Sequence, residues 1–552
     1  MTAMTLHDLL ADAAARHGAR PALSDRGRSL DYDQLLAAVE SAAAGLRAAG
    51  VARHDRVAVY LDKRIETVLA LFGAMAAGAV AVPVNPVLKP HQVGHILQDS
   101  GARLLVSNAG RLGTLAEVLP ETAVARAVRV DDPGAAGDPP VPTESWAALM
   151  QAGDAQAGSS AFRCLDSDMA AILYTSGSTG RPKGVVLSHR NIVVGAQSVA
   201  SYLGNGPGDS LLAALPLSFD AGFSQVTTAV ASGARVVLHT YLTPADVPRI
   251  CAREGITGLT CVPPLWMQLV EARWPEAARK SLRYFANTGG RLPAEVLGRL
   301  RALFPQARPF LMYGLTEAFR STYLDPAEVD RRPGSIGKAI PNAEIQVVKP
   351  DGSLAGPGES GELVHRGPLV ALGYWRDPAR TAERFRPAPD QPSGLPVPEL
   401  AVWSGDTVSL DADGFLYFVG RHDEMIKTSG YRVSPTEVEE VVFASGLVRE
   451  AAAYGVPDRT LGMAIAVAVV PGAAAPAEAA ELAAALEAHC RRALPGYMVP
   501  AVVHSHETLP RSANGKLDRR ALAAAHDTAA DAAADPAADQ VPETAQAVEA
   551  GA

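Results

Sequence analysis

Between residues 56 and 315, short apolar runs alternate with longer segments whose apolar positions have a helical spacing. Runs of this length that alternate with helices are typical of α/β layers built on largely parallel sheets. The runs that we expect to form strands are Val57–Leu61, Leu104–Val106, Ala171–Tyr174, Leu211–Leu215, Val236–His239, Gly258–Val262 and Phe310–Tyr313. The pattern therefore predicts an α/β fold with layered α/β subdomains in this part of the chain.

One apolar stretch, from Val68 to Val84, has the composition of a membrane span. It is shorter than the roughly 20 residues that a spanning helix needs, and it contains Gly73, Gly78 and Pro83. These residues favour a buried helix that ends and is followed by a buried strand. We therefore expect no membrane insertion.

The pattern changes near residue 335. Up to about residue 420, short strand-like runs are separated by glycine turns such as Asp351-Gly352 and Asp413-Gly414, which predict a smaller β-rich subdomain. Beyond Arg421 we expect a compact α+β segment that begins with a hairpin. Its further helices and strands are predicted near Pro435–Ala444, Ala451–Tyr454, Met463–Val470 and Ala477–Ala493.

These changes divide the chain into three expected parts. Residues 1–421 form a large N-terminal domain, and residues 422–523 form a small α+β C-terminal domain. Residues 524–552 form an acidic, alanine-rich tail with no large apolar residue except two valines, so we expect this tail to be disordered.

Composition and charge exclude several classes of protein. The chain is 48% hydrophobic and 20% charged, as in globular proteins. Its formal net charge of −9 offers no basic surface of the kind that nucleic-acid binding requires. The four cysteines form no CxxC pair, which favours a reducing cytoplasm over a disulfide framework or a zinc site. Asp8 and Asp12 lie within the first apolar stretch and argue against a secretory signal.

The stretch YTSGSTGRPKG, from Tyr174 to Gly184, is the strongest chemical signal in the sequence. It lies between an apolar strand-like run and a helix-like run that starts near Asn191. Glycines allow successive backbone N–H groups to point into one concavity, and hydroxyls and a lysine add donors, so the loop is typical of a phosphate site. It is not a Walker A sequence, because no Ser or Thr follows the lysine. The residues expected to bind phosphate are Thr175, Ser176, Gly177, Ser178, Thr179, Gly180 and Lys183.

Four further motifs accompany this loop. They are YGLTEA (313–318), SGD (404–406), GRHDEMIKTSGYRVSP (420–435) and RSANGKLDR (511–519). Together with the loop they resemble the adenylate-forming superfamily, which includes acyl-CoA synthetases, amino-acid adenylation enzymes and firefly-type luciferases. The resemblance runs from about residue 6 to residue 523. It implies a large N-terminal domain, a small mobile C-terminal domain, and the use of ATP and Mg²⁺ to activate a carboxylic acid.

The resemblance also implies individual roles in the ATP site. Tyr313 would stack on the adenine, Thr316 would bond the α-phosphate, and Glu317 would ligate Mg²⁺, a hard cation that prefers oxygen ligands. Asp406 would accept hydrogen bonds from the ribose hydroxyls. Further residues implied at the nucleotide are Gly289, Gly290 and Arg421. The sequence departs from many relatives at Arg291, where they carry an acidic residue.

Catalysis is implied to use two faces of the C-terminal domain in turn. Lys516 would bridge the substrate carboxylate and the α-phosphate while the adenylate forms. A rotation about the hinge residue Asp423 would then replace Lys516 with the face that carries Lys427 and Gly430. There the thiol of CoA or of a phosphopantetheine arm would attack the adenylate. The catalytic residues implied are thus Lys516, Thr316, Glu317 and Lys427.

The acid pocket is expected to begin at LPLSFDAGFSQ, residues 215–225. Fatty-acid and aryl-acid relatives place a histidine or an aromatic pair there, whereas Phe219-Asp220 resembles amino-acid adenylation enzymes. A buried carboxylate needs a cation or donors, so Asp220 has two interpretations: an anchor for a substrate ammonium, or half of an internal salt bridge with Arg320. The residues expected in the pocket are Phe219, Asp220, Ser224, Thr288, Met312 and Arg320.

The first candidate function is that of an AMP-forming acyl-CoA ligase, because LPLSF-D and YGLTEAFRS also resemble stand-alone ligases linked to exosortase-type polysaccharide systems. The alternative is a stand-alone amino-acid adenylation enzyme that loads the phosphopantetheine of a separate carrier protein. A luciferase-like oxygenase shares the first half-reaction. A simple ATPase or kinase is disfavoured by the missing Walker pattern and by Lys516.

Overall fold

The computed structural model of the protein describes residues 3–130, 140–156, 163–175, 182–240, 243–292, 294–421, 425–510, 518–519 and 521–526. The chain divides into two compact units. The first comprises Met1–Ser434 and Thr460–Gly462, and the second comprises Pro435–Arg459 and Met463–Ala552. The predicted hinge at Asp423 and almost all of the predicted disordered tail lie outside the described residues. The domain boundary at residue 421 and the disorder of the tail therefore stay predictions.

An eight-stranded sheet in the first unit has the order β19-β9-β8-β4-β3-β5-β6-β7. Neighbours from β8 to β7 run parallel, and β9 and β19 run antiparallel at one edge. The strands are β3 (Arg56–Tyr60), β4 (Val80–Pro83), β5 (Leu104–Ser107), β6 (Arg126–Arg129), β7 (Thr143–Ser145), β8 (Met169–Thr175), β9 (Lys183–Ser188) and β19 (Gly373–Tyr374).

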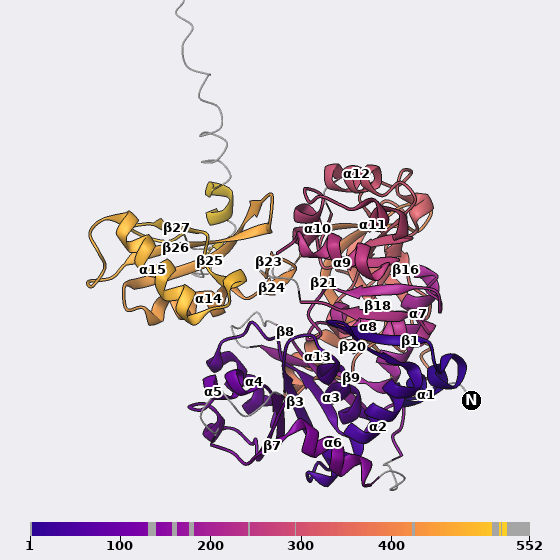
Figure 1. Ribbon diagram of the computed structural model, residues 1–552. Helices are drawn as coiled ribbons and strands as arrows, with labels where there is room; N and C mark the ends of the chain where they lie inside the picture. The colour runs from indigo at the N-terminus through magenta and orange to yellow at the C-terminus, as the bar shows by residue number, and fades with distance from the viewer. Residues whose placement is uncertain are drawn as a thin grey trace, which may run out of the picture. The chain divides into compact units, whose positions relative to one another are not determined.

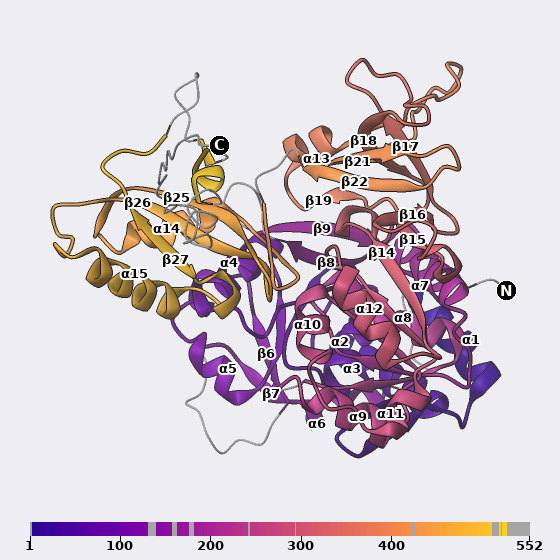
Figure 2. The same ribbon diagram turned by 90° about the horizontal axis from the view of Figure 1, so that it is seen from above.

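Helices cover both faces of this sheet because its strands are apolar on both sides. On β3, Val57 and Val59 belong to one buried cluster, whereas Ala58 and Tyr60 belong to another. One face packs against α2 (Tyr32–Ala48) and α3 (Ile65–Ala76), with α6 (Trp146–Asp154) alongside, and the other packs against α4 (Pro90–Ser100) and α5 (Ala109–Thr114). Both views show α4 and α5 on the side of the sheet away from α2 and α3 (Figures 1 and 2).

The second sheet of this unit has fourteen strands, in the order β17-β18-β21-β22-β16-β15-β14-β13-β12-β10-β11-β1-β2, with β20 paired to β21. Its strands from β14 to β1 are parallel neighbours. The strands are β1 (Pro21–Asp25), β2 (Arg28–Asp31), β10 (Ser210–Ala213), β11 (Arg235–Leu238), β12 (Gly258–Cys261), β13 (Tyr284–Asn287), β14 (Arg308–Tyr313), β15 (Thr322–Leu324), β16 (Ser335–Ala339), β17 (Glu344–Val348), β18 (Ser360–Arg366), β20 (Phe385–Pro387), β21 (Leu400–Leu410) and β22 (Leu416–Arg421).

This large sheet is also covered on both faces along its parallel part. On β10, Leu211 and Ala213 face the core shared with the first sheet, whereas Leu212 faces a separate cluster. That cluster includes side chains of α9 (Asp246–Glu254), α10 (Pro263–Leu269), α11 (Glu276–Ser281) and α12 (Ala294–Leu303). The shared core includes α1 (Leu6–His17), α7 (His189–Leu203) and α8 (Asp220–Ser232).

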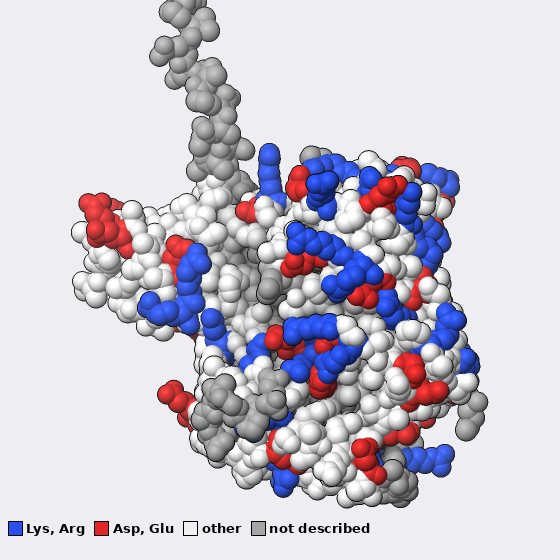
Figure 3. Space-filling model, in the orientation of Figure 1, with Lys and Arg blue, Asp and Glu red and all other residues white. Residues whose placement is uncertain are grey.

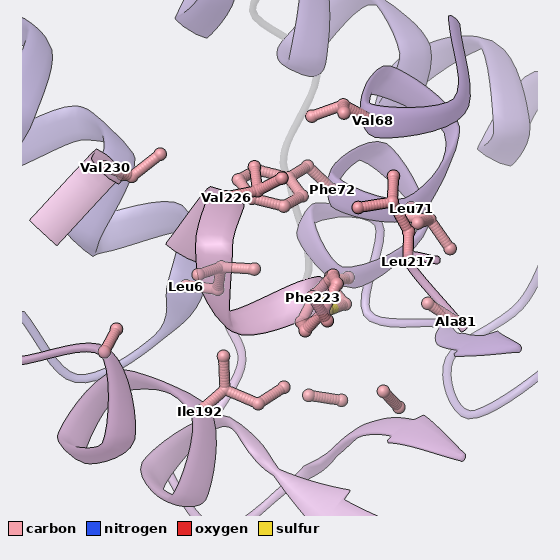
Figure 4. Close-up of a cluster of buried hydrophobic side chains, with 14 of the residues drawn as sticks. Leu6, Val68, Leu71, Phe72, Ala81, Ile192, Leu217, Phe223, Val226 and Val230 are labelled. Carbon is pink, nitrogen blue, oxygen red and sulfur yellow. The ribbon is translucent and has the colours of Figure 1, made fainter. Parts of the chain in front are cut away.

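The shared core holds the two sheets of the first unit together. Phe72 of α3 and Phe223 of α8 meet edge to face, with ring centroids 6.2 Å apart. Side chains of α1, β4 and α7 converge on the same space (Figure 4). Burying one such side chain stabilises the fold by about 1.5–3 kcal/mol, so this layer fixes the position of α8 and of the residues at its start.

The strands predicted up to residue 315 are confirmed, as is the buried helix followed by a strand between Val68 and Val84. The helix expected to start near Asn191 is confirmed as α7, but the phosphate loop does not lead directly into it as expected. Lys183–Ser188 forms β9, antiparallel to β8, so the loop joins two strands and α7 begins only afterwards. Ser188 caps that helix in a capping box with Asn191. The positive end of a helix therefore does not follow the loop directly.

The predicted β-rich subdomain is confirmed between β16 and β22, and it extends the large sheet instead of standing apart. It also carries α13 (Pro378–Arg384). The predicted hairpin after Arg421 is β23 (Ile426–Thr428) with β24 (Tyr431–Val433), and it belongs to the first unit.

The second unit contains β25 (Val448–Asp458), β26 (Gly462–Pro471) and β27 (Val502–Ser505), with α14 (Pro435–Ala444) and α15 (Ala479–Ala493). β26 lies between β25 and β27, and β27 runs parallel to it. Both helices and the two predicted strands of this segment are confirmed.

Charged side chains of both signs are intermixed over the face of the first unit shown in Figure 3. In the described parts of the chain, no helix has the length and apolar character that a membrane crossing requires.

Candidate active site

The loop residues on either side of the phosphate motif are placed by the β8–β9 hairpin. Thr175 ends β8 and Lys183 begins β9, and the two residues are opposite each other in the pairing of these strands. The hydroxyl oxygen of Thr175 is buried and has no hydrogen-bond partner among the described residues. Ser176, Gly177, Ser178, Thr179 and Gly180 lie outside the described residues, so their contact with phosphate stays a prediction.

Lys183 reaches a buried carboxylate and a tyrosine. Its ammonium group lies 3.2 Å from Oε1 of Glu317 and donates a hydrogen bond of 2.7 Å to the hydroxyl of Tyr374. That hydroxyl in turn donates to Oε1 of Glu317 over 2.7 Å. The three side chains come from β9, β19 and a short 3₁₀ helix, Thr316–Ala318, that follows β14.

The electrostatics of this cluster keep Glu317 ionised. Its side chain is 1% exposed, and burial alone opposes the charged form. The ammonium of Lys183 and the guanidinium groups of Arg432 and Arg384 outweigh that effect and hold the pKa of Glu317 well below its usual range. Burial and the neighbouring carboxylate raise the pKa of Tyr374, so its hydroxyl remains a neutral donor.

A hydrogen bond joins Tyr313, which is predicted at the adenine, to Asp406, which is predicted at the ribose. The Tyr313 hydroxyl donates a hydrogen bond of 2.5 Å to Oδ2 of Asp406. Tyr313 is the last residue of β14, and Asp406 lies on β21 with 3% exposure. The cross-sheet bond links the end of the parallel strands to the β-rich subdomain, where a nucleotide site in an α/β sheet is expected.

Gly289 and Gly290 follow β13 at the same edge of the sheet. Gly289 has a φ of +77°, a left-handed conformation that favours glycine. A methyl group there would lie 3.2 Å from Cγ1 of Val262. The local backbone thus requires a glycine at this position.

Asp220 is the first residue of α8 and lies beside Thr316. The Thr316 hydroxyl donates to Oδ1 of Asp220 over a long distance, 3.4 Å. Burial raises the pKa of Asp220, and the attraction of Arg320 offsets only part of that rise. Among the described residues no ion pair within 4.0 Å joins Asp220 to Arg320 or to another basic group. The internal salt bridge is therefore not present as a direct contact.

Arg320 is turned toward a different partner. Phe319, just before it, has a left-handed φ of +57°. Arg320 is 2% exposed, and its Nη1 donates a hydrogen bond of 2.5 Å to the hydroxyl of Thr288. Its Nε is buried and has no hydrogen-bond partner in the described part of the chain.

Four of the six predicted pocket residues line two cavities, and Asp220 and Thr288 line neither. A small cavity of about 20 Å³ is lined by Arg320, Met312 and Ser224, together with the hydroxyl-bearing residues Thr228, Thr260 and Tyr284. A larger cavity of about 270 Å³ is lined by Phe219 and by Ser429, Gly430 and Tyr431 of the β23–β24 hairpin. The rings of Phe219 and Tyr431 meet edge to face, with centroids 4.9 Å apart.

The family assignment rests on sequence profiles that match most of the chain. The profile described as AMP-binding enzyme matches residues 10–375, and the profile of the AMP-binding enzyme C-terminal domain matches residues 437–516. The chain belongs to the AMP-binding enzyme family. This AMP-binding enzyme is an AMP-forming acid–thiol ligase that activates a carboxylic acid to an acyl-adenylate.

Relatives of this AMP-binding enzyme include both ligase types that the motifs suggest. The long-chain-fatty-acid–CoA ligase of Salmonella typhimurium is 31% identical, over 94% of each chain. The L-proline–[L-prolyl-carrier protein] ligase of Pseudomonas fluorescens is 32% identical, over 94% of this chain and 98% of the relative. A solved structure of o-succinylbenzoate CoA synthetase from Bacillus subtilis has a TM-score of 0.77 at 28% identity, and the match covers 93% of this chain and 97% of that one. The link to exosortase systems stays a prediction.

Two polar residues of this AMP-binding enzyme were missed by the sequence analysis. Tyr374 lies 57 positions beyond Glu317, and no spacing or charge marks it in the sequence. Lys63 lines the larger cavity, donates a hydrogen bond of 2.5 Å to the carbonyl oxygen of Ala214, and has its pKa lowered to about 7 by burial. A lysine two positions before a strongly apolar helix, α3, was the available signal.

Several predicted residues of this AMP-binding enzyme cannot be placed. Asp423, Lys516 and the side chain of Arg421 lie outside the described residues. Lys427 is placed on β23, with its ammonium 4.8 Å from the centre of the Phe418 ring. The roles inferred for these residues stay predictions.

Proposed function

We propose that the protein activates a small carboxylic acid with ATP and Mg²⁺, releases pyrophosphate, and transfers the acyl group to the thiol of CoA. The observation that carries this proposal is the buried chain of hydrogen bonds from Lys183 through Tyr374 to Glu317. It places a cation and an ionised carboxylate side by side just beyond β14, and the cation belongs to the strand that follows the glycine-rich loop in the sequence. This combination suits a nucleotide with its metal, because the phosphates need the cation and the metal needs the carboxylate.

Glu317 fits the role of a magnesium ligand. Its Oε1 is engaged by Tyr374 and Lys183, whereas Oε2 accepts no hydrogen bond from any described residue. The bound ion would supply charge neutralisation on the phosphates, so that an anionic carboxylate can approach the α-phosphorus.

The chain's own residues account for the rest of the activation step. Lys183 neutralises phosphate charge, and Thr316 orients the α-phosphate from the start of the 3₁₀ helix. Lys516 aligns the substrate carboxylate with the phosphorus, because phosphoryl-type transfer depends mainly on positioning and electrostatic stabilisation. Asp406 and Arg421 hold the ribose, with Tyr313 against the adenine. We place this reaction in the cytoplasm, where ATP and CoA are found.

A second candidate function is amino-acid adenylation followed by loading of a separate carrier protein. It is favoured by the absence of a direct ion pair between Asp220 and Arg320 among the described residues, since Asp220 is then available for a substrate ammonium. The prolyl-carrier-protein ligase relative supports the same acceptor.

The test is acid-dependent ATP–pyrophosphate exchange over a panel of amino acids, fatty acids and aryl acids. We expect exchange with at least one class and none with Lys516→Ala. CoA and a phosphopantetheinylated carrier are then supplied to the enzyme with the active acid, and the thioester is identified by mass spectrometry. Release of phosphate without any exchange would contradict the proposal. Thioester on the carrier alone would select the second candidate.

A further inference from the structure

Arg320 lines the small cavity, and Asp220 directly precedes Ala221, which lines the same cavity. Neither charge has an ion partner within 4.0 Å among the described residues. Arg320 is almost fully buried, and its only side-chain hydrogen bond there is to the neutral hydroxyl of Thr288. Asp220 is partly buried, and its one side-chain hydrogen-bond partner among the described residues is Thr316, at a long distance.

A guanidinium in this position is costly without an anion. Removing a charge from water costs several kcal/mol unless a counter-charge and hydrogen bonds replace the lost hydration. The unpartnered Nε of Arg320 is an unused donor beside the bonded Nη1, and a planar pair of donors suits a carboxylate. Arg320 also lines the small cavity, so an anion that enters this cavity reaches it.

The two charges do not satisfy each other. The left-handed backbone at Phe319 and the bond to Thr288 hold Arg320 toward the small cavity. Asp220 lies instead beside Thr316, next to the magnesium ligand Glu317 and therefore at the reacting end of the pocket. A ligand with a cation at its reacting end and an anion at its far end would pair with both.

We propose that the acid substrate is a short amino acid with a second carboxylate, an aminodicarboxylate whose ammonium pairs with Asp220 and whose far carboxylate pairs with Arg320. The remaining carboxylate attacks the α-phosphate. This inference rests on the proposed function and adds the substrate class. Ser224, Thr228 and Thr260 line the same cavity, so their hydroxyls are further donors for the far carboxylate, and the small cavity disfavours a long side chain.

The test compares pairs of substrates that differ in one charge. ATP–pyrophosphate exchange is measured with L-aspartate, L-glutamate, L-asparagine and succinate. We expect L-aspartate to exceed L-asparagine by about 10- to 100-fold in kcat/KM, the worth of a charged hydrogen-bonded pair. Succinate tests the ammonium contact in the same way, because it lacks the amino group.

The variant Arg320→Gln assigns the far contact. It keeps a donor for Thr288 and removes the charge, so it raises the KM for L-aspartate about 10-fold or more and leaves that for L-asparagine within about twofold. A general folding defect would affect both substrates alike. Arg279→Gln, at an exposed arginine of α11, is the matched control. Asp220→Asn should weaken both amino acids but not succinate.

Several outcomes would overturn the inference. L-asparagine equal to or better than L-aspartate, or equal losses for both in Arg320→Gln, would remove the role of Arg320. Exchange with fatty or aryl acids only would overturn the substrate class and leave the proposed function standing. If no acid gives exchange, the proposed function fails, and calorimetric titration of the wild-type protein with L-aspartate then decides the substrate class, since no binding contradicts it.

Discussion

The hydroxyl of Tyr374 donates a hydrogen bond of 2.7 Å to Glu317 and accepts one of the same length from Lys183. The bond joins residues that are 57 positions apart, on the short edge strand β19 and on the turn after β14. Tyr374 therefore positions both the predicted metal ligand and the predicted phosphate-binding lysine without a charge of its own.

We expect Tyr374→Phe to lower kcat/KM for MgATP by about 10- to 100-fold, the cost of losing a hydrogen bond to a charged group. The measurement is ATP–pyrophosphate exchange at saturating acid over a range of ATP and Mg²⁺ concentrations. Tyr417→Phe is the matched control, because its hydroxyl bonds to Asp411 away from these residues. A similar loss in both variants would show that the effect is not specific to Tyr374.

The ionised carboxylate of Asp220 is expected to lower the stability of the folded protein. Burial raises the pKa of Asp220, so the folded protein binds the carboxyl proton more tightly than the unfolded chain does. The free energy of unfolding therefore falls as the pH rises from about 4, the ordinary pKa of an aspartate, through the pKa in the folded state. Asp220→Asn removes this penalty. We therefore expect the variant to have a higher Tm than the wild type at pH 7, a difference that shrinks as pH falls, while it loses exchange activity.

Thermal unfolding from pH 4.5 to 8, with the substrate absent, measures that difference. A lower Tm for Asp220→Asn at pH 7 would indicate that the carboxylate is stabilised in the free protein.

Lys516→Ala should separate the two half-reactions. The lysine is expected to act only while both anions are held together, so its loss abolishes adenylate formation. Transfer from a supplied acyl-adenylate to the thiol should remain within a fewfold of the wild-type rate. The two rates are measured separately, by pyrophosphate exchange and by thioester formation. Equal loss of both would contradict the division of roles.

Substitution by alanine is expected to have opposite effects on stability at Gly289 and at Gly298. Gly289→Ala forces a side chain into a left-handed backbone against Val262 and should destabilise the fold by about 1–3 kcal/mol. Gly298 lies on the exposed side of α12 with open space around it, so Gly298→Ala should stabilise by about 0.4–1 kcal/mol. Denaturant unfolding measures both. Neutrality of Gly289→Ala would mean that the turn before α12 can relax.

The strands and helices that could be predicted are those whose own residues carry a clear pattern of apolar positions. β3 and β8 are runs buried on both faces, and such runs are visible in the sequence. β9 was missed because Val185–Leu187 is too short to stand out, and its strand conformation depends on pairing with β8. Tertiary pairing, not local preference, decides such a segment.

The candidate site shows the same limit. Lys183 and Glu317 could be named from their motifs, yet Tyr374 could not, because β19 joins the sheet only through its pairing with β9. The pairing of Asp220 with Arg320 was suggested because Arg320 follows the YGLTEA motif and was expected to face the same pocket as Asp220. The backbone turn at Phe319 instead directs Arg320 to Thr288, and no local pattern encodes that direction.

The most direct test of acid activation follows one oxygen atom. The active acid is labelled with ¹⁸O in its carboxylate, the enzyme is supplied with ATP, Mg²⁺ and the thiol, and the AMP formed is analysed by mass spectrometry. If the carboxylate attacks the α-phosphorus and the thiol then displaces AMP, each AMP carries one labelled oxygen. Unlabelled AMP, or label in inorganic phosphate, would contradict the adenylate mechanism.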